Sequence, residues 1–239
     1  VFYMSNTTIE TVNTPKPNFD FNTLLQALKY RYATKKFDGT KDIPKDQFDN
    51  ILEAARLSPT SFGLETWQLV VVDDKAVRQE LKKFAWGAQD ALDNASKFVV
   101  ILANKRQDLK FGSAYMDHML KDVHQVPDEV YNFYKDAYTN FGENTYKTFE
   151  SERAAFDWSA RQGYIVMANM MVAAAYQGID SCALEGIIPA EFDRILGEEQ
   201  KVFDTAHYGV AAAVAFGYRK ETPDRDKSRR PLSESVLWK

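Results

Sequence analysis

The chain has 239 residues, of which 45% are hydrophobic, 13% aromatic and 27% charged, so it can build a sizeable core and is not wholly disordered. Its 30 basic and 34 acidic residues nearly balance, which excludes a general attraction to nucleic acid or to an anionic membrane. The single cysteine excludes an intramolecular disulfide, and no apolar run is long enough to span a bilayer, so a cytoplasmic protein is expected.

In chain order, the sequence predicts a flexible arm over residues 1–18 and then one domain over residues 19–239. Apolar residues at helical spacing, with prolines and glycines near the ends, predict helices over residues 22–32, 44–58, 75–86, 112–141 (broken at Pro127), 148–177 and 189–197. Short apolar runs predict strands over residues 67–74, 97–104, 178–186 and 208–219. Strict strand–helix alternation fails in the long middle of the chain, so the predicted class is α+β with a buried central helix.

The spacing of the eleven glycines restricts how a phosphate could be bound. No two of them lie closer than eight residues, which excludes both the G-x-G-x-x-G loop and the Walker A loop. Any phosphate must therefore be held by cationic side chains. His118 and His124 fall on different helix faces, which argues against a metal site. No local motif supports a nucleophilic pair of Cys182 with His207, so a hydrolase that uses this pair is a distant alternative.

Two basic clusters and one polar loop are the candidates for ligand contact. The first cluster holds Arg31, Lys35 and Lys36, and the second occupies residues 219–230, after the last predicted strand. Arginine pairs can bind a phosphate bidentately, although each cluster taken alone is more typical of a solvated surface. The loop over residues 58–67 carries short hydroxyls and Gly63, which permits close backbone approach to a ligand.

Four short segments in register carry a resemblance to a known family. They are Arg31-Tyr32-Ala33-Thr34-Lys35 with Phe37, Ser58-Pro59-Thr60-Ser61 with Glu65-Thr66-Trp67, Ala183-Leu184-Glu185-Gly186, and Lys227-Ser228-Arg229-Arg230-Pro231. Together they resemble the nitroreductase family of FMN-dependent oxidoreductases, over residues 22–231. The resemblance implies a central mixed, mainly antiparallel sheet flanked by helices, in an intertwined homodimer with FMN at the subunit interface. The tail over residues 228–239 is expected to pack on the partner subunit.

The resemblance also implies roles for individual residues. Arg31, Lys227 and Arg229 would hold the FMN phosphate, and Lys35 would reach the polar edge of the flavin ring beside Tyr32 and Ala33. Pro59, Thr60 and Ser61, with Gly63 nearby, would come from the other subunit. The backbone at Ala183, Leu184, Glu185 and Gly186 would lie along the flavin, with an N–H aimed at N5. Gln89 and Gln162 are candidate donors to the pyrimidine edge. Tyr131, Phe133 and Tyr134 could wall an acceptor pocket or equally belong to the core.

The expected activity is electron transfer from NADH or NADPH through the flavin to nitroaromatic, quinone or similar acceptors, with ping-pong turnover and no protein acid or base. A flavin reductase or specific-metabolite reductase on the same fold, and a non-catalytic flavin-binding protein, are the alternatives. Three departures from the family pattern bear on the site: Ala33 for serine, Glu65-Thr66 for Gln-Pro, and Ala183 for proline. No metal, nucleic-acid or membrane partner is expected.

Overall fold

The fold is built on a four-stranded antiparallel sheet. The computed structural model describes residue 12 and residues 21–239. The predicted arm over residues 1–18 therefore lies outside the described residues, except for residue 12. The strands are β1 (Trp67–Val71), β2 (Lys97–Asn104), β3 (Asp180–Leu184) and β4 (Tyr208–Gly217). Their order is β1-β2-β4-β3, and every neighbouring pair is antiparallel. The register places Lys97 beside Phe216 at one end of the sheet and Asn104 beside Tyr208 at the other.

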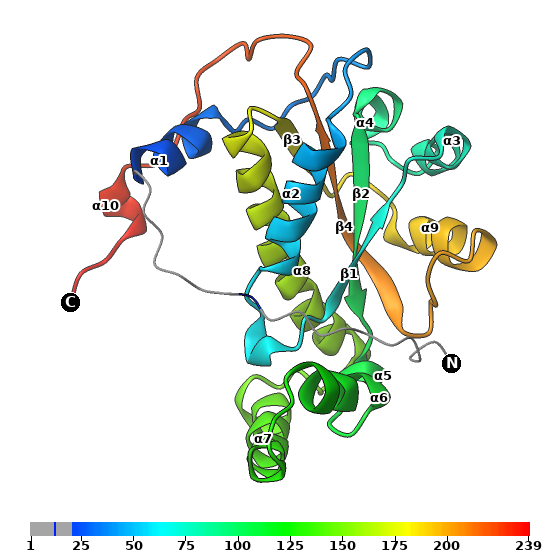
Figure 1. Ribbon diagram of the computed structural model, residues 1–239, viewed down its shortest axis with the longest axis vertical. Coiled ribbons are helices and arrows are strands. Elements are labelled where there is room, and N and C mark those ends of the chain that lie inside the picture. The colour runs from blue at the N-terminus through cyan, green and yellow to red at the C-terminus, as the bar shows by residue number, and fades with distance from the viewer. Residues whose placement is uncertain (1–11, 13–20) are drawn as a thin grey trace.

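Both faces of the two central strands are covered, which explains their continuous apolar sequences. One face packs against α2 (Lys45–Arg56) and α8 (Glu152–Tyr176), and α1 (Phe21–Tyr30) packs against α8 (Figure 1). The opposite face packs against α3 (Lys75–Lys82), α4 (Gln89–Asn94), α9 (Pro189–Phe192) and the wide turn η4 (Asp193–Glu199). Two hydrophobic clusters fill these layers.

The long central helix α8 lies close against the sheet. Ser151 caps its start, because its hydroxyl accepts a hydrogen bond from the Ala154 amide at 3.0 Å. A Cβ added at Gly163 would lie 2.8 Å from the Ile101 side chain, so glycine permits the close approach of helix and strand. Val166 and Met170 are fully buried against the sheet. The predicted buried central helix is confirmed.

A helical excursion between β2 and α8 forms the third cluster. Its members are α5 (Arg106–Leu109), α6 (Ala114–Asp117), η2 (His118–Val123), α7 (Asp128–Asn140) and η3 (Phe141–Thr145). Tyr138 lies at its centre, where its ring contacts Phe62, Phe149 and Trp158 and its hydroxyl donates to the Leu109 carbonyl at 2.9 Å. Phe62 comes from η1 (Ser61–Gly63), so this cluster binds the loop before β1 to the excursion.

Most element predictions hold, and the exceptions have local causes. The helix expected over residues 75–86 ends at Lys82, and α4 was not predicted at all. Six residues are too few to display helical periodicity, and Gln89 at the start of α4 donates to the Lys82 and Ala85 carbonyls, which stabilises the turn between the two helices. The last element is α10 (Leu232–Ser235). In the described part of the chain, no helix combines the length and hydrophobicity needed to cross a membrane.

Candidate functional site

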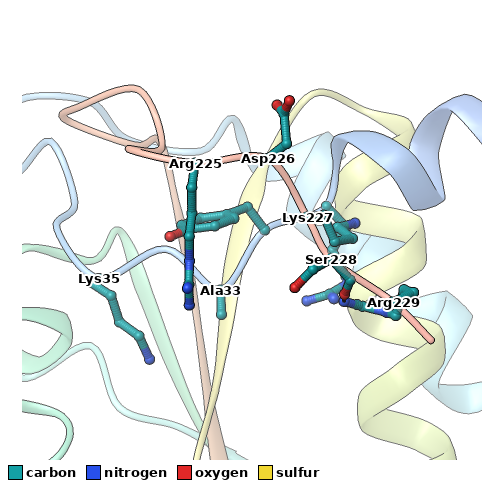
Figure 2. A pocket seen from close by; sticks show the side chains of 9 residues that line it. Ala33, Lys35, Arg225, Asp226, Lys227, Ser228 and Arg229 are labelled. Carbon is teal, nitrogen blue, oxygen red and sulfur yellow. Dashed lines mark hydrogen bonds between the residues drawn. The ribbon is translucent and has the colours of Figure 1, made fainter.

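A positively charged hollow of about 260 Å³ lies beside the C-terminal end of α1 (Figure 2). One wall comes from the segment directly after α1, through Arg31, Tyr32, Ala33 and Lys35. The other comes from residues 225–229, in the segment after β4. The two predicted basic clusters, nearly two hundred residues apart in sequence, therefore meet in one place.

The first wall is held against the edge of the sheet. Ala33 forms a parallel bridge with Ser181 of β3, and the Thr34 amide donates to the Ser181 carbonyl at 3.2 Å. This bridge is the one parallel pairing beside the antiparallel strands in the described chain. Phe37 is buried, and its amide donates to the Asp90 carboxylate at 2.8 Å. Residues 31–35 are thus anchored on both sides, which orders the cations they carry.

The second wall is tied to the first. The Lys220 amide donates to the Lys36 carbonyl at 3.0 Å, so the segment leaving β4 starts beside residues 31–37. Further along, the Lys227 ammonium donates to the Leu28 carbonyl of α1 at 2.6 Å. A lysine at a helix C-terminus is stabilised by the exposed carbonyls there. Lys227 lies close enough to Arg31 and Arg229 for both charges to act on it.

Arg31, Lys227 and Arg229 form a group of cations, named here the cation trio. Burial lowers the pKa of Lys227 below that of a free lysine, and the charges of Arg31 and Arg229 lower it further. Among the described residues, no carboxylate forms an ion pair with any of the three. Three uncompensated cations at close range repel one another, so this arrangement favours a bound anion.

Other cations of the two clusters are already paired. Arg219 donates to the buried Asp180 carboxylate through Nε at 2.7 Å, and its guanidinium lies 4.5 Å from the ring centre of Tyr30. Lys36 forms an exposed ion pair with Glu221 at 3.1 Å. Because these charges are neutralised by the protein, they are not available to a ligand. Lys36 and Glu221 both lie on the surface.

Lys35 lies apart from the trio and beside β3. Its Nζ is 3.8 Å from the Sγ of Cys182, a buried residue of that strand. Burial raises the pKa of the Cys182 thiol, and the nearby Lys35 charge opposes this only in part. The thiol is therefore protonated at neutral pH and a poor nucleophile. His207 precedes the opposite end of β4 and pairs with Asp108 at 2.8 Å, so the two residues of the predicted hydrolase pair are far apart.

The Ala183–Gly186 segment continues from Cys182 along the same edge. Gly87 and Gly186 touch: the Gly87 amide donates to the Gly186 carbonyl at 2.8 Å. Leu184 is buried, whereas Ala183 and Glu185 are exposed. This segment does not line the hollow itself but runs onward from it, so a flat ligand at Lys35 would extend along its backbone.

A tyrosine holds the side chain of Glu185. The Tyr164 hydroxyl, from α8, donates to Oε1 of Glu185 at 2.5 Å. Burial, and then this hydrogen bond to a carboxylate, raise the pKa of Tyr164 to about 12. The phenol is thus a permanent donor near neutral pH, and it directs the Glu185 carboxylate toward α8 and not toward Lys35.

The Pro59–Gly63 loop lies at the opposite end of the sheet. It leads into β1, whose Trp67 pairs with Ala103 near the end of β2, whereas residues 33–37 lie near Gly217 at the other end (Figure 1). The seven residue steps of β2 between these ends span about 24 Å. One chain therefore does not bring Pro59, Thr60, Ser61 and Gly63 to its own hollow.

Three side chains hold this loop. The Ser61 amide donates to Oε1 of Gln162 at 2.9 Å, the Thr60 hydroxyl accepts from the Glu65 amide at 2.9 Å, and Nε2 of His124 lies 2.7 Å from the Gly63 carbonyl oxygen. Phe62 and Glu65 have positive φ angles of 58° and 46°, which are uncommon for residues with side chains. Such a conformation persists because its surroundings determine it, so the loop has a defined shape.

The predicted pyrimidine-edge donors are both engaged within the chain. Gln162 is buried, accepts from Ser61 and donates to the Trp158 carbonyl at 3.2 Å. Gln89 uses its Nε2 on two backbone carbonyls of the α3–α4 turn. Neither lines the hollow, and their contact with a flavin stays a prediction.

The predicted acceptor residues lie in the helical excursion, at the same end as the Pro59–Gly63 loop. Tyr131 donates to the Asp117 carboxylate at 2.5 Å, and Lys121 lies 4.5 Å from its ring centre. Tyr134 packs edge-on against Phe62. Phe133, by contrast, is 71% exposed. Two of the three aromatics are thus packed within the chain, and Phe133 is the one free to meet a ligand or another chain.

Three residues that line the hollow had no individual role assigned from the sequence: Arg225, Asp226 and Ser228. Arg225 belongs to the predicted basic cluster over residues 219–230, but it lies outside the Lys227–Pro231 segment that carried the resemblance. Its position depends on how the 219–231 segment folds back over residues 31–35, and no local pattern records that. In the portion of the chain that the structure describes, no three histidine, cysteine or acidic side chains gather as a metal site.

Comparison with known proteins identifies the class of this fold and site. The family model described as "Nitroreductase family" matches residues 28–218. The chain belongs to the nitroreductase family, a family of oxidoreductases, which confirms the resemblance seen in the four segments.

Individual relatives agree with this assignment. The chain is 42% identical over 215 residues to "Putative NAD(P)H nitroreductase YfkO" of Bacillus subtilis, covering 90% of this chain and 96% of the relative. It is 41% identical over 216 residues to a protein of the same description from Staphylococcus haemolyticus, with coverage of 90% and 97%.

Solved structures share the fold. The nitroreductase ydfN of Bacillus subtilis matches with a TM-score of 0.74 at 22% identity, covering 92% of this chain and 100% of that one. A nitroreductase from Exiguobacterium sibiricum, solved in complex with FMN, matches with a TM-score of 0.70 at 19% identity, with coverage of 95% and 100%. These neighbours confirm the predicted α+β fold with its mainly antiparallel sheet.

Proposed function

We propose that this protein is an FMN-dependent oxidoreductase that passes electrons from NAD(P)H to nitroaromatic, quinone or similar small acceptors. The observation that carries the proposal is the cation trio of Arg31, Lys227 and Arg229, which forms no ion pair with a carboxylate of the described chain. The trio shares its hollow with Lys35, which lies beside the edge strand β3. A trio of this kind suits the phosphate dianion of FMN, since charge-assisted hydrogen bonds from arginine are strong and directional. The naming of relatives as NAD(P)H nitroreductases and the FMN complex of a structural neighbour support the same choice.

The remaining residues of the site suit the ring of the cofactor. FMN, when bound, supplies two-electron chemistry, taking hydride from a nicotinamide and passing electrons to an acceptor. Lys35 would place a positive charge at the ring's polar edge and so stabilise the extra negative charge of the reduced state. Gly87 and Gly186 touch through their backbones, with no side chain between them, in the segment that runs onward from Lys35. No acid or base from the protein is required.

A homodimer would complete the site. The Pro59–Gly63 loop and the exposed Phe133 lie at the opposite end of the sheet from the hollow of their own chain. In a symmetric dimer each loop could reach the partner's hollow, as the family resemblance implies. The tail supports such a contact, because Leu237 and Trp238 are more than 90% exposed in the single chain and would be covered on a partner.

The first experiment tests the cofactor and the donor together. Purified protein, supplied with FMN, should be yellow, and anaerobic NADH or NADPH should bleach the flavin spectrum. Addition of a nitroaromatic or quinone should restore it. Protein that stays colourless in excess FMN would contradict the proposal. Protein that binds FMN but is not reduced by either donor would be the non-catalytic flavin-binding alternative.

A second experiment tests the shared site. Chains carrying Arg229→Ala, which lose the phosphate contact, are mixed with chains altered at Thr60 and Ser61, which lose the loop contact. At an FMN concentration that saturates the wild type but not the variants, each homodimer should be largely inactive. Random mixing should restore about a quarter of the normal sites, because half of the dimers are heterodimers and one of their two sites is intact. Failure to regain any activity, despite exchange shown by differently tagged chains, would contradict a site built from two subunits.

Steady-state kinetics test the order of events and the acceptor. One site that serves donor and acceptor in turn should give parallel lines in double-reciprocal plots, as in ping-pong turnover. A panel of nitro, quinone and flavin acceptors separates a nitroreductase from a flavin reductase. The buried, reduced Cys182 supports our further proposal that the protein works in the cytoplasm.

A further inference from the structure

The hollow carries more positive charge than the phosphate of FMN requires. Arg31, Lys227 and Arg229 account for that phosphate, and Lys35 for the ring, which leaves Arg225 without a role. We infer that Arg225 binds a phosphate group of the nicotinamide donor. The inference rests on the proposed function, since it places the donor beside a flavin held by the other four cations.

The position of Arg225 separates it from the trio. Figure 2 shows its side chain hanging from the 219–231 segment into the hollow, between Lys35 and Ala33, while Lys227 and Arg229 lie on the far side of Ala33. Asp226, the next residue, also lines the hollow, and in the same view its carboxylate points away from the Arg225 guanidinium. The Arg225 guanidinium therefore lies on the Lys35 side of the hollow, apart from Lys227 and Arg229.

The charge of Arg225 is not used within the chain. No ion pair joins it to a carboxylate among the described residues, in contrast to Arg219, which is paired with Asp180. Arginine is an effective ligand for phosphate because its planar fork matches two phosphate oxygens at once. NADH and NADPH both carry a diphosphate, and NADPH carries an additional phosphate monoester. A phosphate of the donor is thus the anion that the proposed reaction supplies.

A fourth cation on the FMN phosphate is the less favourable assignment. Burial, and then the charges of Arg31 and Arg229, already lower the pKa of Lys227, so another guanidinium there would add repulsion before the phosphate binds. Since Arg225 projects toward Lys35, it extends the positive surface away from the trio. The two groups are placed to bind two different anions.

The test compares Arg225→Ala and Arg225→Lys with Arg230→Ala, a matched arginine of the same exposed segment that does not line the hollow. FMN-loaded proteins are titrated with NADP⁺ and NAD⁺ to obtain dissociation constants without turnover, and with NADPH and NADH for steady-state kinetics. Loss of a charge-assisted pair corresponds to about tenfold weaker binding. We therefore expect Arg225→Ala to raise the Kd and the KM about tenfold at unchanged kcat. Arg225→Lys should lie between, and Arg230→Ala should match the wild type.

The two donors distinguish the two phosphate sources. A loss confined to NADP⁺ and NADPH assigns Arg225 to the phosphate monoester, and an equal loss for both donors assigns it to the shared diphosphate. Arg225→Ala that behaves like Arg230→Ala toward both donors overturns the inference, and so does a variant that binds donors normally but releases FMN. Wild-type protein that never binds FMN would instead overturn the proposed function.

Discussion

Gly87 and Gly186 lie in direct backbone contact at the end of β3. A Cβ built on Gly186 would lie 2.5 Å from the Cα of Gly87, and the amide of Gly87 donates to the carbonyl of Gly186 at 2.8 Å. This pair connects the turn after α3 to the segment that leaves β3. It therefore sets where the Ala183–Gly186 backbone lies relative to Lys35.

Gly186→Ala should move this segment and lower stability. The added methyl meets backbone, which cannot rotate away, so we expect about 1–3 kcal/mol of lost free energy of unfolding, together with weaker FMN binding. Chemical denaturation and FMN titration measure the two effects. Gly39→Ala is the control, since its nearest neighbour at 3.0 Å is the movable end of the Asn94 side chain. A Gly186→Ala protein with normal FMN affinity would show that the segment does not contact the cofactor.

Arg229→Ala should weaken FMN binding by about tenfold to a hundredfold, because a charge-assisted hydrogen bond to phosphate is lost. Lys36→Ala removes a cation from the same region, but only one that is paired with Glu221 on the surface, and should change the affinity little. Arg225→Ala should also retain FMN better than Arg229→Ala. Fluorescence titration of FMN gives all three constants, and equal losses across the set would mean a diffuse electrostatic attraction in place of a defined trio.

The binding of FMN should weaken at alkaline pH because of Lys227. Burial and the two arginines lower the pKa of Lys227 in the unliganded protein, and a bound phosphate would raise it again. Affinity is therefore expected to fall as the pH rises through the unliganded pKa, which lies below about 10.5. Lys227→Arg, whose charge persists, should flatten the profile. An unchanged slope in that variant would assign the pH dependence to another group.

The same shift has the opposite sign for folding of the unliganded protein. Below its lowered folded pKa, Lys227 is charged in both states, and the folded state bears the cost of that charge. As the pH rises through the window between the folded and unfolded pKa values, the folded state loses its proton first, and the contribution of this group to stability improves. Urea unfolding without FMN, compared between wild type and Lys227→Arg, measures this contribution.

Gln162→Leu should destabilise the Pro59–Gly63 loop. The Ser61 amide would lose its acceptor at a partly buried position, which costs about 1 kcal/mol of unfolding free energy. Gln162→Glu keeps an acceptor for Ser61 and should retain more of the stability. Direct contact of Gln162 with the flavin would instead shift the visible spectrum of the bound cofactor in both variants, so the spectrum separates the two roles.

Local pattern predicted the elements well where they are long or strongly apolar. Three long elements lie where they were expected, namely the strands at residues 97–104 and 208–217 and the helix at residues 152–176. Elements buried on both sides have long runs of apolar residues, which are easy to recognise in the sequence. The four motif segments also identified the family. Short elements such as α4 went unpredicted, because six residues are too few to show a helical spacing of hydrophobic residues. This helix is instead stabilised by hydrogen bonds from the Gln89 side chain to carbonyls of the preceding turn.

By itself, then, the sequence determined the fold class, the family and the residue types that can hold a phosphate. Only the tertiary structure decided which cations are free: Arg219 is neutralised by Asp180 and Lys36 by Glu221, whereas Arg31, Lys227 and Arg229 share the hollow with Arg225. It also placed the Pro59–Gly63 loop at the far end of the sheet. The reason is physical. The spacing of hydrophobic residues indicates which side of each segment is buried. The pairing of charges depends instead on distances that are set by strand order and by contacts between segments nearly two hundred residues apart.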